Sequence, residues 1–351
     1  MNPPAPHIPL RKRYRNARVL VTGGAGFIGS RLTEMLIDCG ATVVVVDDLS
    51  TGRRANLRHC AADRLHFLRR DINDREGVVR AMKGVDVVFH LACLGVRHSL
   101  HAPAANHAVN ATGALTVLEA ARIAGIGRFV HVSTSEVYGN PFAAPIDENQ
   151  PTFPNTVYGG AKLAGEAYAR AFFLAYGAPV VIVRPFNAFG PNAHFEGDCG
   201  EAIPRFFLSA LTGNELTIFG DGSQTRDFTF VDDIAAGLAA AGMAPGVEGE
   251  TINLGSGREI SIERLAEQIV ALTGASPELI RYDAPRPGDT RRLCASVEKA
   301  RRLLRYEPRV EFERGLRAIC RCYAAKPAAT LRAMHKQITR RNWTAATDDA
   351  R

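Results

Sequence analysis

The sequence lacks the long apolar runs that mark membrane-spanning segments. Its 351 residues are 46% hydrophobic, yet no stretch approaches the roughly 18 consecutive apolar residues that a transmembrane helix requires. The N-terminal segment is rich in proline and arginine and has no apolar core of the kind found in secretory signals. We therefore expect a cytoplasmic protein that is neither exported nor held in a membrane.

Paired cysteines and metal-ligand spacings are also missing. The seven cysteines are odd in number and show no paired spacing of the kind that binds zinc. Cys320 and Cys322 are better explained by an ordinary helix near the C-terminus. Free thiols in a reducing compartment fit this pattern, so we expect neither a disulfide framework nor a metal site.

An excess of positive charge is found only at the two ends of the chain. The net charge is +7, but residues 1–18 carry five basic and no acidic side chains, and residues 325–351 carry six basic and two acidic ones. The segment between them is therefore slightly acidic. We predict a flexible basic arm over residues 1–17, a basic tail over residues 324–351, and no nucleic-acid partner.

A glycine-rich turn follows the first apolar run. The pattern predicts a strand over 18–21 and an amphipathic helix over 27–39, with three glycines spaced three apart around the turn between them. Such glycines permit a tight turn, close approach of the backbone to a pyrophosphate, and close packing of helix on strand. The helix N-terminus then faces the anion. The residues predicted to hold a dinucleotide here are Gly23, Gly26, Phe27, Ile28 and Gly29.

The second predicted strand ends in an acid. Residues 41–46 form an apolar run, and Asp47 follows where a carboxylate binds the hydroxyls of a ribose. A 2′-phosphate would be repelled there, so Asp47 favours NAD over NADP. Arg53 and Arg54 lie close enough in sequence to compensate for this repulsion, which leaves NADP open.

Further apolar runs predict a parallel sheet that is buried on both faces. Strands are expected over 65–68 and 85–92, and Asp71 with Ile72 follows the first of them as a plausible adenine contact. Later in the chain we expect strands over 180–183 and 251–254 and a helix over 231–243.

A cluster of hydroxyl groups follows the apolar run at 128–132. Residues 133–139 are rich in serine and threonine and fall at the carboxyl edge of the sheet, where open α/β folds bind ligands. A proline-containing segment then leads to Tyr158 and Lys162, which lie four residues apart and share one face of a helix. Both side chains can therefore reach one cofactor.

Tyr158 and Lys162 have the chemistry to start a hydride transfer. A phenol with an ordinary pKa of ~10 is a poor base at neutral pH, but a nearby lysine and a positively charged nicotinamide would lower that pKa by ~3 units. Tyr158 then becomes a usable base, and Lys162 would hydrogen-bond the nicotinamide ribose. Thr134 or Ser135 would hold the sugar oxygen that loses its proton.

At this point the sequence resembles the extended short-chain dehydrogenase/reductase family, in particular its nucleotide-sugar epimerase and dehydratase branch. The resemblance spans about residues 18–323 and is to enzymes like the UDP-glucose 4-epimerases. Besides the features above, it rests on residues 90–92, Asn110 and the segments 184–191, 220–228 and 286–289.

The resemblance implies an α/β fold with two lobes. A Rossmann-type, doubly wound parallel sheet over residues 18–185 and about 231–258 would hold NAD. A smaller, discontinuous α/β lobe over about 186–230 and 259–323 would bind a nucleoside-diphosphate sugar, most often a UDP-sugar. The protein would be a homodimer through helices that include residues 106–124 and 156–176.

The resemblance also implies further site residues. Leu91, Ala92, Asn110 and Ser133 would join the NAD site. Asn187, Arg226 and Arg286 would lie near the sugar diphosphate, since guanidinium groups suit a pyrophosphate, and Asp289 would reach the nucleoside ribose. Arg97 and Ser99 would contact the substrate, and the polar loop 192–200 would cover the sugar.

The resemblance leaves several reactions open. All begin with oxidation at C4 of the sugar, which gives a 4-keto intermediate and NADH. Residues 95–99 and Tyr158 with Gly159 favour a 4-epimerase, although His98 replaces the usual tyrosine. Glu136 favours a 4,6-dehydratase or a UDP-glucuronate decarboxylase, yet Ser135 stands where many dehydratases have an aspartate. We predict a 4-epimerase. The alternatives are a 4,6-dehydratase, a UDP-glucuronate decarboxylase, and an NAD-binding regulator or scaffold without turnover.

Overall fold

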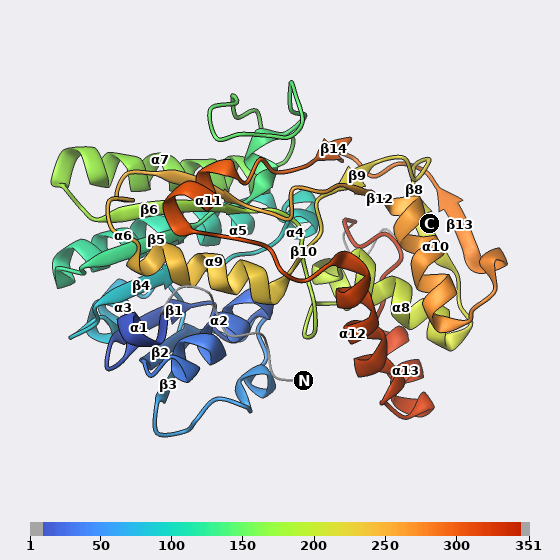
Figure 1. Ribbon diagram of the computed structural model, residues 1–351, viewed down its shortest axis with the longest axis horizontal. Coiled ribbons are helices and arrows are strands. Elements are labelled where there is room, and N and C mark those ends of the chain that lie inside the picture. The colour runs from blue at the N-terminus through green and yellow to red at the C-terminus, as the bar shows by residue number, and fades with distance from the viewer. Residues whose placement is uncertain (1–9, 345–351) are drawn as a thin grey trace.

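The first lobe is built on a seven-stranded sheet. The computed structural model describes residues 10–344 (Figure 1), and its main sheet has the strand order β11-β6-β5-β4-β1-β2-β3. Every neighbouring pair in it is parallel. The predicted strands and the doubly wound α/β class are confirmed. The bounds are β1 Arg18–Thr22, β2 Thr42–Asp47, β3 Leu65–Arg69, β4 Val87–His90, β5 Arg128–Val132, β6 Val180–Pro185 and β11 Thr251–Leu254.

Helices cover both faces of this sheet because successive side chains of a strand point to opposite faces. Val19 and Val21 of β1 pack in one apolar cluster, and Leu20 between them packs in another. The first cluster includes α2 (Phe27–Asp38) and α9 (Val231–Met243). The second includes α3 (Arg75–Ala81), α6 (Gly113–Ala124) and α7 (Val157–Tyr176). Apart from the edge strand β3, in which His66 and Leu68 are exposed, the apolar runs therefore form strands with little solvent-facing surface.

The strand order reverses at β1. The chain passes from β1 to β2 and β3 on one side and then crosses to β4 on the other. The carboxyl ends of β1 and β4 therefore open a crevice, which is where such sheets bind ligands. Short helices α4 (Val96–His101) and α5 (Pro103–His107) follow β4, and a 3₁₀ turn at Ser135–Tyr138 follows β5.

The second lobe has its own apolar core, which includes Phe207, Ile218 and Leu265. Three small sheets surround it: β7 (Ala188–Phe189) with β10 (Thr229–Phe230), β8 (Leu216–Phe219) with β13 (Ile280–Asp283), and β9 (Thr225–Arg226) between β12 (Ile260–Ser261) and β14 (Arg292–Leu293). Its helices are α8 (Ala202–Thr212), α10 (Ile262–Thr273), α12 (Phe312–Ala324) and α13 (Ala328–His335).

One part of the region expected in the second lobe belongs to the first. Leu293, Ala295, Leu304 and Tyr306 join the core beneath the main sheet, with α11 (Glu298–Leu304) among them. The Tyr306 hydroxyl donates to the carbonyl of Gly255, 3.0 Å away. Residues of the predicted block 259–323 are thus divided between the two lobes.

Both predicted tails are partly folded. Residues 10–14 form α1, in which Leu10 and Tyr14 are buried and the Tyr14 hydroxyl donates to the Ala239 carbonyl of α9 at 2.7 Å. The prediction of a flexible arm is therefore wrong for these residues, because Leu10 and Tyr14 share one helical face that packs on α9. At the other end, residues 328–344 fold onto the second lobe. Residues 1–9 and 345–351 lie outside the described part.

Two further features concern the described residues only. None of the helices between residues 10 and 344 is long and apolar enough to cross a bilayer. The same residues hold no group of three or more histidine, cysteine, aspartate or glutamate side chains arranged to bind a metal ion. All seven cysteines are free.

Candidate active site

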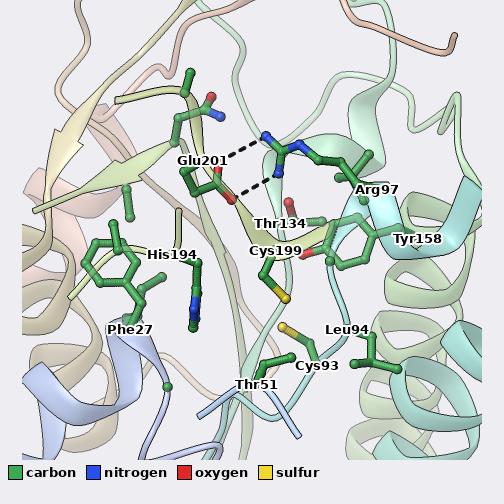
Figure 2. A pocket seen from close by; sticks show the side chains of 18 of the residues that line it. Phe27, Thr51, Cys93, Leu94, Arg97, Thr134, Tyr158, His194, Cys199 and Glu201 are labelled. Carbon is green, nitrogen blue, oxygen red and sulfur yellow. Dashed lines mark hydrogen bonds and ion pairs between the residues drawn. The ribbon is translucent and has the colours of Figure 1, made fainter. Parts of the chain in front are cut away.

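One cavity of about 810 Å³ runs between the two lobes. Its walls extend from the glycine turn after β1, past Tyr158 on α7, to the arginines and aromatic side chains of the second lobe. Figure 2 shows its centre, where Thr134 and Tyr158 lie together and Arg97 faces Glu201. The cavity thus joins the two ends of the molecule that the sequence assigns to cofactor and substrate.

The glycine turn is too tight for side chains. Gly23 has a φ of +68°, and a Cβ placed on Gly29 would lie 2.1 Å from the carbonyl oxygen of Gly23. Larger residues are excluded at both positions because L side chains rarely adopt such a φ and no real contact is so short. All five predicted residues of this turn line the cavity, namely Gly23, Gly26, Phe27, Ile28 and Gly29.

Asp47 shapes the same end of the cavity. Its carboxylate accepts the backbone N–H groups of Ala25 and Leu49 at 2.9 and 2.8 Å. Burial raises the pKa of Asp47, and these two hydrogen bonds oppose the rise. Arg53 pairs instead with Glu196, and Arg54 lies over the ring of Phe67, so neither arginine lines the cavity.

Most of the other predicted NAD contacts line the cavity too, but Asn110 does not. Its amide donates to the Leu94 carbonyl at 2.8 Å, and its oxygen accepts the Leu94 N–H at 3.1 Å. Asn110 is therefore turned inward, where it fixes the loop after β4, and its direct contact with NAD stays a prediction. The predicted residues that do line the cavity are Asp71, Ile72, Leu91, Ala92 and Ser133.

Tyr158 and Lys162 are brought together by the first turns of α7. Thr156 caps this helix, accepting the N–H of Gly159 at 3.2 Å. Tyr158 and Lys162 are buried on the cavity side, with exposed fractions of 9% and 2%. The phenol lies beside the side chain of Thr134 (Figure 2), and the Lys162 ammonium donates to the Val132 carbonyl at 2.5 Å.

The electrostatics of Tyr158 differ from the expectation. Burial raises the pKa of Tyr158 well above its ordinary value, neighbouring Cys93 and Glu136 add to the rise, and the Thr134 hydrogen bond opposes it. Burial also lowers the pKa of Lys162. In the chain alone, burial outweighs any lowering of the Tyr158 pKa by Lys162, and the lowering expected with a bound nicotinamide stays a prediction.

Glu136 is directed into the cavity rather than into the turn that it begins. The backbone N–H of Glu136 donates to the Thr134 hydroxyl at 3.2 Å, so Thr134 is the cap. Burial raises the pKa of the Glu136 carboxyl, and the charges of Arg226 and Arg286 oppose the rise. Ser135, also in the cavity wall, is buried beside it.

Arginines gather where the cavity enters the second lobe. Arg226 and Arg286 both donate to Oδ1 of Asp289, and Arg97 pairs with Glu201 at 3.3 Å. Burial, with Arg97 nearby, lowers the pKa of Arg205 to about 10. Guanidinium groups thus outnumber their carboxylate partners, as an anion-binding site requires.

Three polar atoms in this region are buried without a protein partner. They are Oδ1 of Asn187, Nε of Arg286 and Oδ1 of Asn342, and all three residues line the cavity. Such atoms are costly unless a ligand or water satisfies them. Ser99, by contrast, donates its hydroxyl to the Val96 carbonyl at 2.7 Å and does not line the cavity, and its substrate contact stays a prediction.

The loop over residues 192–200 forms one wall of the cavity. Ala193, His194 and Cys199 line it, and Figure 2 shows His194 and Cys199 on the same side as Glu201. His101 of α4 contacts Asp198 at 3.0 Å, which ties the loop to the first lobe. The loop is therefore packed between the lobes, as a cover for the sugar requires.

Sequence reasoning missed several residues of this cavity. Glu201 and Arg205 lie at the start of α8 and belong to no motif, although an acid followed four residues later by an arginine is a visible signal. The C-terminal segment also reaches the cavity with Arg340, Asn342 and Trp343. These contacts were not expected, because the basic composition of this segment predicts a tail.

Comparison with known proteins places the chain in a family. Residues 19–255 match the model of the NAD dependent epimerase/dehydratase family. The chain belongs to this family. It is 38% identical over 304 residues to UDP-glucose 4-epimerase of Mycolicibacterium smegmatis, a match that covers 85% of the chain and 96% of the relative. The resemblance to extended short-chain dehydrogenase/reductases is thereby confirmed.

Two solved structures extend the comparison. The epimerase Mth375 of Methanothermobacter thermautotrophicus is 38% identical with a TM-score of 0.88, covering 96% of this chain and 99% of that one. The dTDP-glucose 4,6-dehydratase DesIV of Streptomyces venezuelae, solved with NAD and TYD, is 36% identical with a TM-score of 0.83, covering 88% and 97%. NAD is the cofactor of this family, and the glycine turn, Asp47 and the buried, unpartnered Ser133 hydroxyl fit it.

Proposed function

We propose that the protein is an NAD-dependent nucleoside-diphosphate-sugar 4-epimerase that acts through a transient 4-keto sugar. The close approach of Tyr158 and Thr134, in the same cavity as the arginine cluster, carries this proposal (Figure 2). It joins a proton acceptor to a site for an anionic sugar donor. The family contains epimerases and dehydratases, so the choice between them rests on the residues around Tyr158.

The proton chemistry belongs to Tyr158. Its phenolate would take the proton of the sugar 4-hydroxyl, with Thr134 aligning the two oxygens, and the phenol would return that proton to O4 after the keto sugar has turned, as the hydride returns to the opposite face of C4. Burial alone holds the phenol protonated. NAD, when bound, supplies the hydride acceptor for C4 and a positive charge that favours the phenolate. Lys162, buried one helical turn away, would hold the nicotinamide ribose.

The substrate diphosphate is assigned to the arginine cluster. Arg226 and Arg286 share a single carboxylate, Asp289, which leaves donor capacity for phosphate oxygens. Asn187 lies in the same wall with an unpartnered oxygen. Asp289 would in addition reach the nucleoside ribose, in competition with the two arginines.

The absence of a free acid beside Glu136 favours epimerisation over dehydration. A dehydratase needs a base at C5 and an acid to protonate the leaving hydroxyl, and Ser135 cannot supply that proton. Glu201 is the other carboxylate near Tyr158, but its ion pair with Arg97 outweighs its burial and holds the pKa of Glu201 below the usual value. The side chains near Tyr158 therefore do not supply both the base and the acid that a dehydratase needs.

Glu136 nevertheless favours a second candidate. Its carboxyl faces the cavity and its pKa is raised by burial, so it would accept a proton from C5 of a 4-keto sugar or lie beside the carboxylate of a uronic acid. A 4,6-dehydratase, or less favourably a UDP-glucuronate decarboxylase, is therefore the alternative.

The direct test is incubation of the purified protein with UDP-, dTDP- and GDP-sugars, including uronic acids. Products would be followed by mass spectrometry and proton NMR. An unchanged mass with inversion at C4 supports the 4-epimerase. Loss of water or of CO₂ would replace it with the dehydratase or the decarboxylase. No conversion of any donor would favour a dinucleotide-binding regulator.

A homodimer is also proposed on the family resemblance. The helices α6 and α7 fall in the expected ranges and carry exposed apolar side chains, among them Ile123 (49% exposed), Leu174 (74%) and Tyr176 (61%). Exposed apolar residues gathered on adjacent helices mark interaction surfaces. Light scattering would measure the mass in solution, and a monomer at all concentrations would contradict this proposal.

A further inference from the structure

The segment after α12 is anchored around the cavity at three places. Arg205 of α8 donates to the carbonyls of Thr339 and Arg340, at 2.9 and 3.0 Å. The amide of Asn342 donates to the carbonyls of Gly197 and Gly200, at 2.9 and 3.2 Å. Arg340 and Arg341 both pair with the carboxylate of Asp283 on β13. Residues 336–344, here called the C-terminal strap, are therefore held by α8, by the loop over the sugar end and by β13.

The strap contributes side chains to the cavity itself. Ile338, Arg340, Asn342 and Trp343 line it together with Tyr158 and Arg226. The ring of Trp343 meets the ring of Phe219 nearly at right angles, with their centroids 4.6 Å apart and their planes at 82°. An edge-to-face contact of this kind fixes the orientation of the indole and leaves a face of it for another partner.

The position of this aromatic pair follows from the strand register. Phe219 ends β8 and is paired with Asp283 of β13. Three residues after Asp283 comes Arg286, which shares Asp289 with Arg226. Phe219 and Trp343 therefore lie next to the arginine cluster on the side of the second lobe.

The other side of the arginine cluster leads to the reacting groups. The charges of Arg226 and Arg286 act on Glu136, and Glu136 in turn acts on Tyr158. The cavity thus presents a proton acceptor, then paired guanidinium groups, then an aromatic wall. That is the order of sugar, diphosphate and base in a nucleoside-diphosphate sugar.

We propose that the C-terminal strap completes the nucleobase subsite, with the indole face of Trp343 packing on the heterocyclic base of the substrate. Every nucleobase has a π-face that stacks on aromatic side chains, and Phe219 holds the indole in place for it. This inference rests on the proposed nucleoside-diphosphate-sugar substrate. It assigns a binding role to a segment that composition alone marks as a tail.

The strap also links the two ends of the substrate. Asn342 is 2% exposed and donates both of its hydrogen bonds to the loop that carries Cys199, a residue of the sugar end of the cavity. The N–H of Gly197 in turn donates to the Gln337 carbonyl at 3.2 Å. A base that packs on Trp343 therefore stabilises the strap, and the strap stabilises the loop over the sugar.

Trp343 is the single tryptophan of the chain, which makes the test direct. The NAD-loaded protein is titrated with UDP, dTDP and GDP, and separately with inorganic pyrophosphate, while tryptophan emission is recorded and binding heats are measured by calorimetry. We expect at least one nucleoside diphosphate to bind and to change the emission. Pyrophosphate should occupy the arginine cluster and leave the emission nearly unchanged.

Variants separate stacking from folding. Trp343→Ala should weaken binding of the nucleoside diphosphate by about 10-fold, as loss of one base–aromatic stack predicts, and leave pyrophosphate affinity unchanged. Trp343→Phe should restore most of the loss. Tyr282→Ala is the matched control, because Tyr282 is a half-exposed aromatic residue of the same lobe that does not line the cavity. Thermal melts of all variants check the fold.

Two results would overturn the inference, and they are distinguishable. If a nucleoside diphosphate binds by calorimetry but neither changes the emission nor loses affinity in Trp343→Ala, the strap is not part of the base subsite while the proposed substrate class stands. If none of the three nucleotides binds the intact protein, the proposed substrate class fails and the inference fails with it.

Discussion

The two ends of the cavity are built in different ways. At the cofactor end, the lining residues follow neighbouring strands of one sheet, and Asp47 is already satisfied by the N–H groups of Ala25 and Leu49. At the substrate end, side chains arrive from distant segments, and Oδ1 of Asn187 and Nε of Arg286 are buried without protein partners. The first end is largely fixed without its ligand and leaves one such atom, the Ser133 hydroxyl, whereas the second leaves several and is assembled from distant segments.

This difference indicates which end carries specificity. A preorganised cradle binds its cofactor with little rearrangement, so its residues tolerate few changes. A site with surplus guanidinium groups and unpartnered atoms gains most of its order when the anionic substrate arrives. Variants at the cofactor end should therefore affect NAD retention, and variants at the substrate end should affect KM and product identity.

The largest effect is expected at the junction of the two ends. Tyr158→Phe removes the proton acceptor but keeps the ring that packs beside Thr134. Turnover should fall by about 10²–10⁴-fold, the usual contribution of a positioned acid–base group, while NAD stays bound. Steady-state rates and the absorbance of bound cofactor measure the two quantities. A variant with near-normal turnover would remove Tyr158 from the mechanism.

The next effect belongs to the substrate end. Arg286→Ala removes one of the two guanidinium groups that share Asp289, and KM for the nucleotide sugar should rise by about 10- to 30-fold, in keeping with loss of a charge-assisted contact. NAD affinity should not change. Arg53→Ala is the matched control, because Arg53 pairs with Glu196 and does not line the cavity. Equal effects of both variants on KM would argue against a diphosphate site.

A smaller effect is expected at the cofactor end. Asp47→Asn leaves one oxygen to accept two backbone N–H groups and removes a charge from the ribose site. NAD should bind about 10-fold more weakly, the cost of roughly one hydrogen bond to a charged group, and KM for the sugar should be unchanged at saturating NAD. Calorimetry with NAD and with NADP makes the measurement. Stronger binding of NADP than of NAD by the unaltered protein would contradict the cofactor assignment.

The smallest effect should be at Glu136. For a 4-epimerase, Glu136→Gln should change kcat by less than about 3-fold, because no proton passes through this group. Burial raises the Glu136 pKa, so its ionised form is lost as pH falls through that raised value. A dehydratase using it as a base would lose activity over that acidic range, and Glu136→Gln would abolish both the activity and that limb of the pH profile. Such a result would select the alternative reaction.

Much of the sheet could be predicted because its signal is local. Apolar runs mark strands that are buried on both faces, and the predicted strands at 128–132 and 251–254 have the same bounds in the structure. The glycine turn was also predictable, since the collision of a Cβ at Gly29 with the preceding turn follows from residues six apart.

Side-chain direction was harder to predict. Ser99 and Asn110 occupy the expected places in the chain, but their side chains bond to nearby backbone rather than to the cavity. The spacing of residues predicts which face of a helix or strand a side chain lies on. It does not predict which hydrogen-bond partner a short polar side chain on that face will have. The raised pKa of Tyr158 in the chain alone was not expected for a similar reason, because burial dominates it and burial is not visible in a motif.

The C-terminal strap was missed because its structure depends on distant contacts. Its basic residues predicted a solvated tail, yet Arg340 and Arg341 pair with Asp283, and Asn342 reaches two carbonyls of another loop. Each of these partners lies more than fifty residues away in sequence. Composition does not show which distant residues pair. Within the strap, the tryptophan Trp343 was the one residue whose type pointed to a packed segment.

The measurement that tests the central claim most directly follows one hydrogen. A nucleotide sugar carrying deuterium at C4 is converted by the NAD-loaded protein, and the label is located by NMR. A 4-epimerase returns the same atom to the opposite face, so we predict deuterium at C4 of a product with inverted configuration and unchanged sugar composition. Deuterium at C6 of a product that has lost water would show a dehydratase instead and would contradict the account.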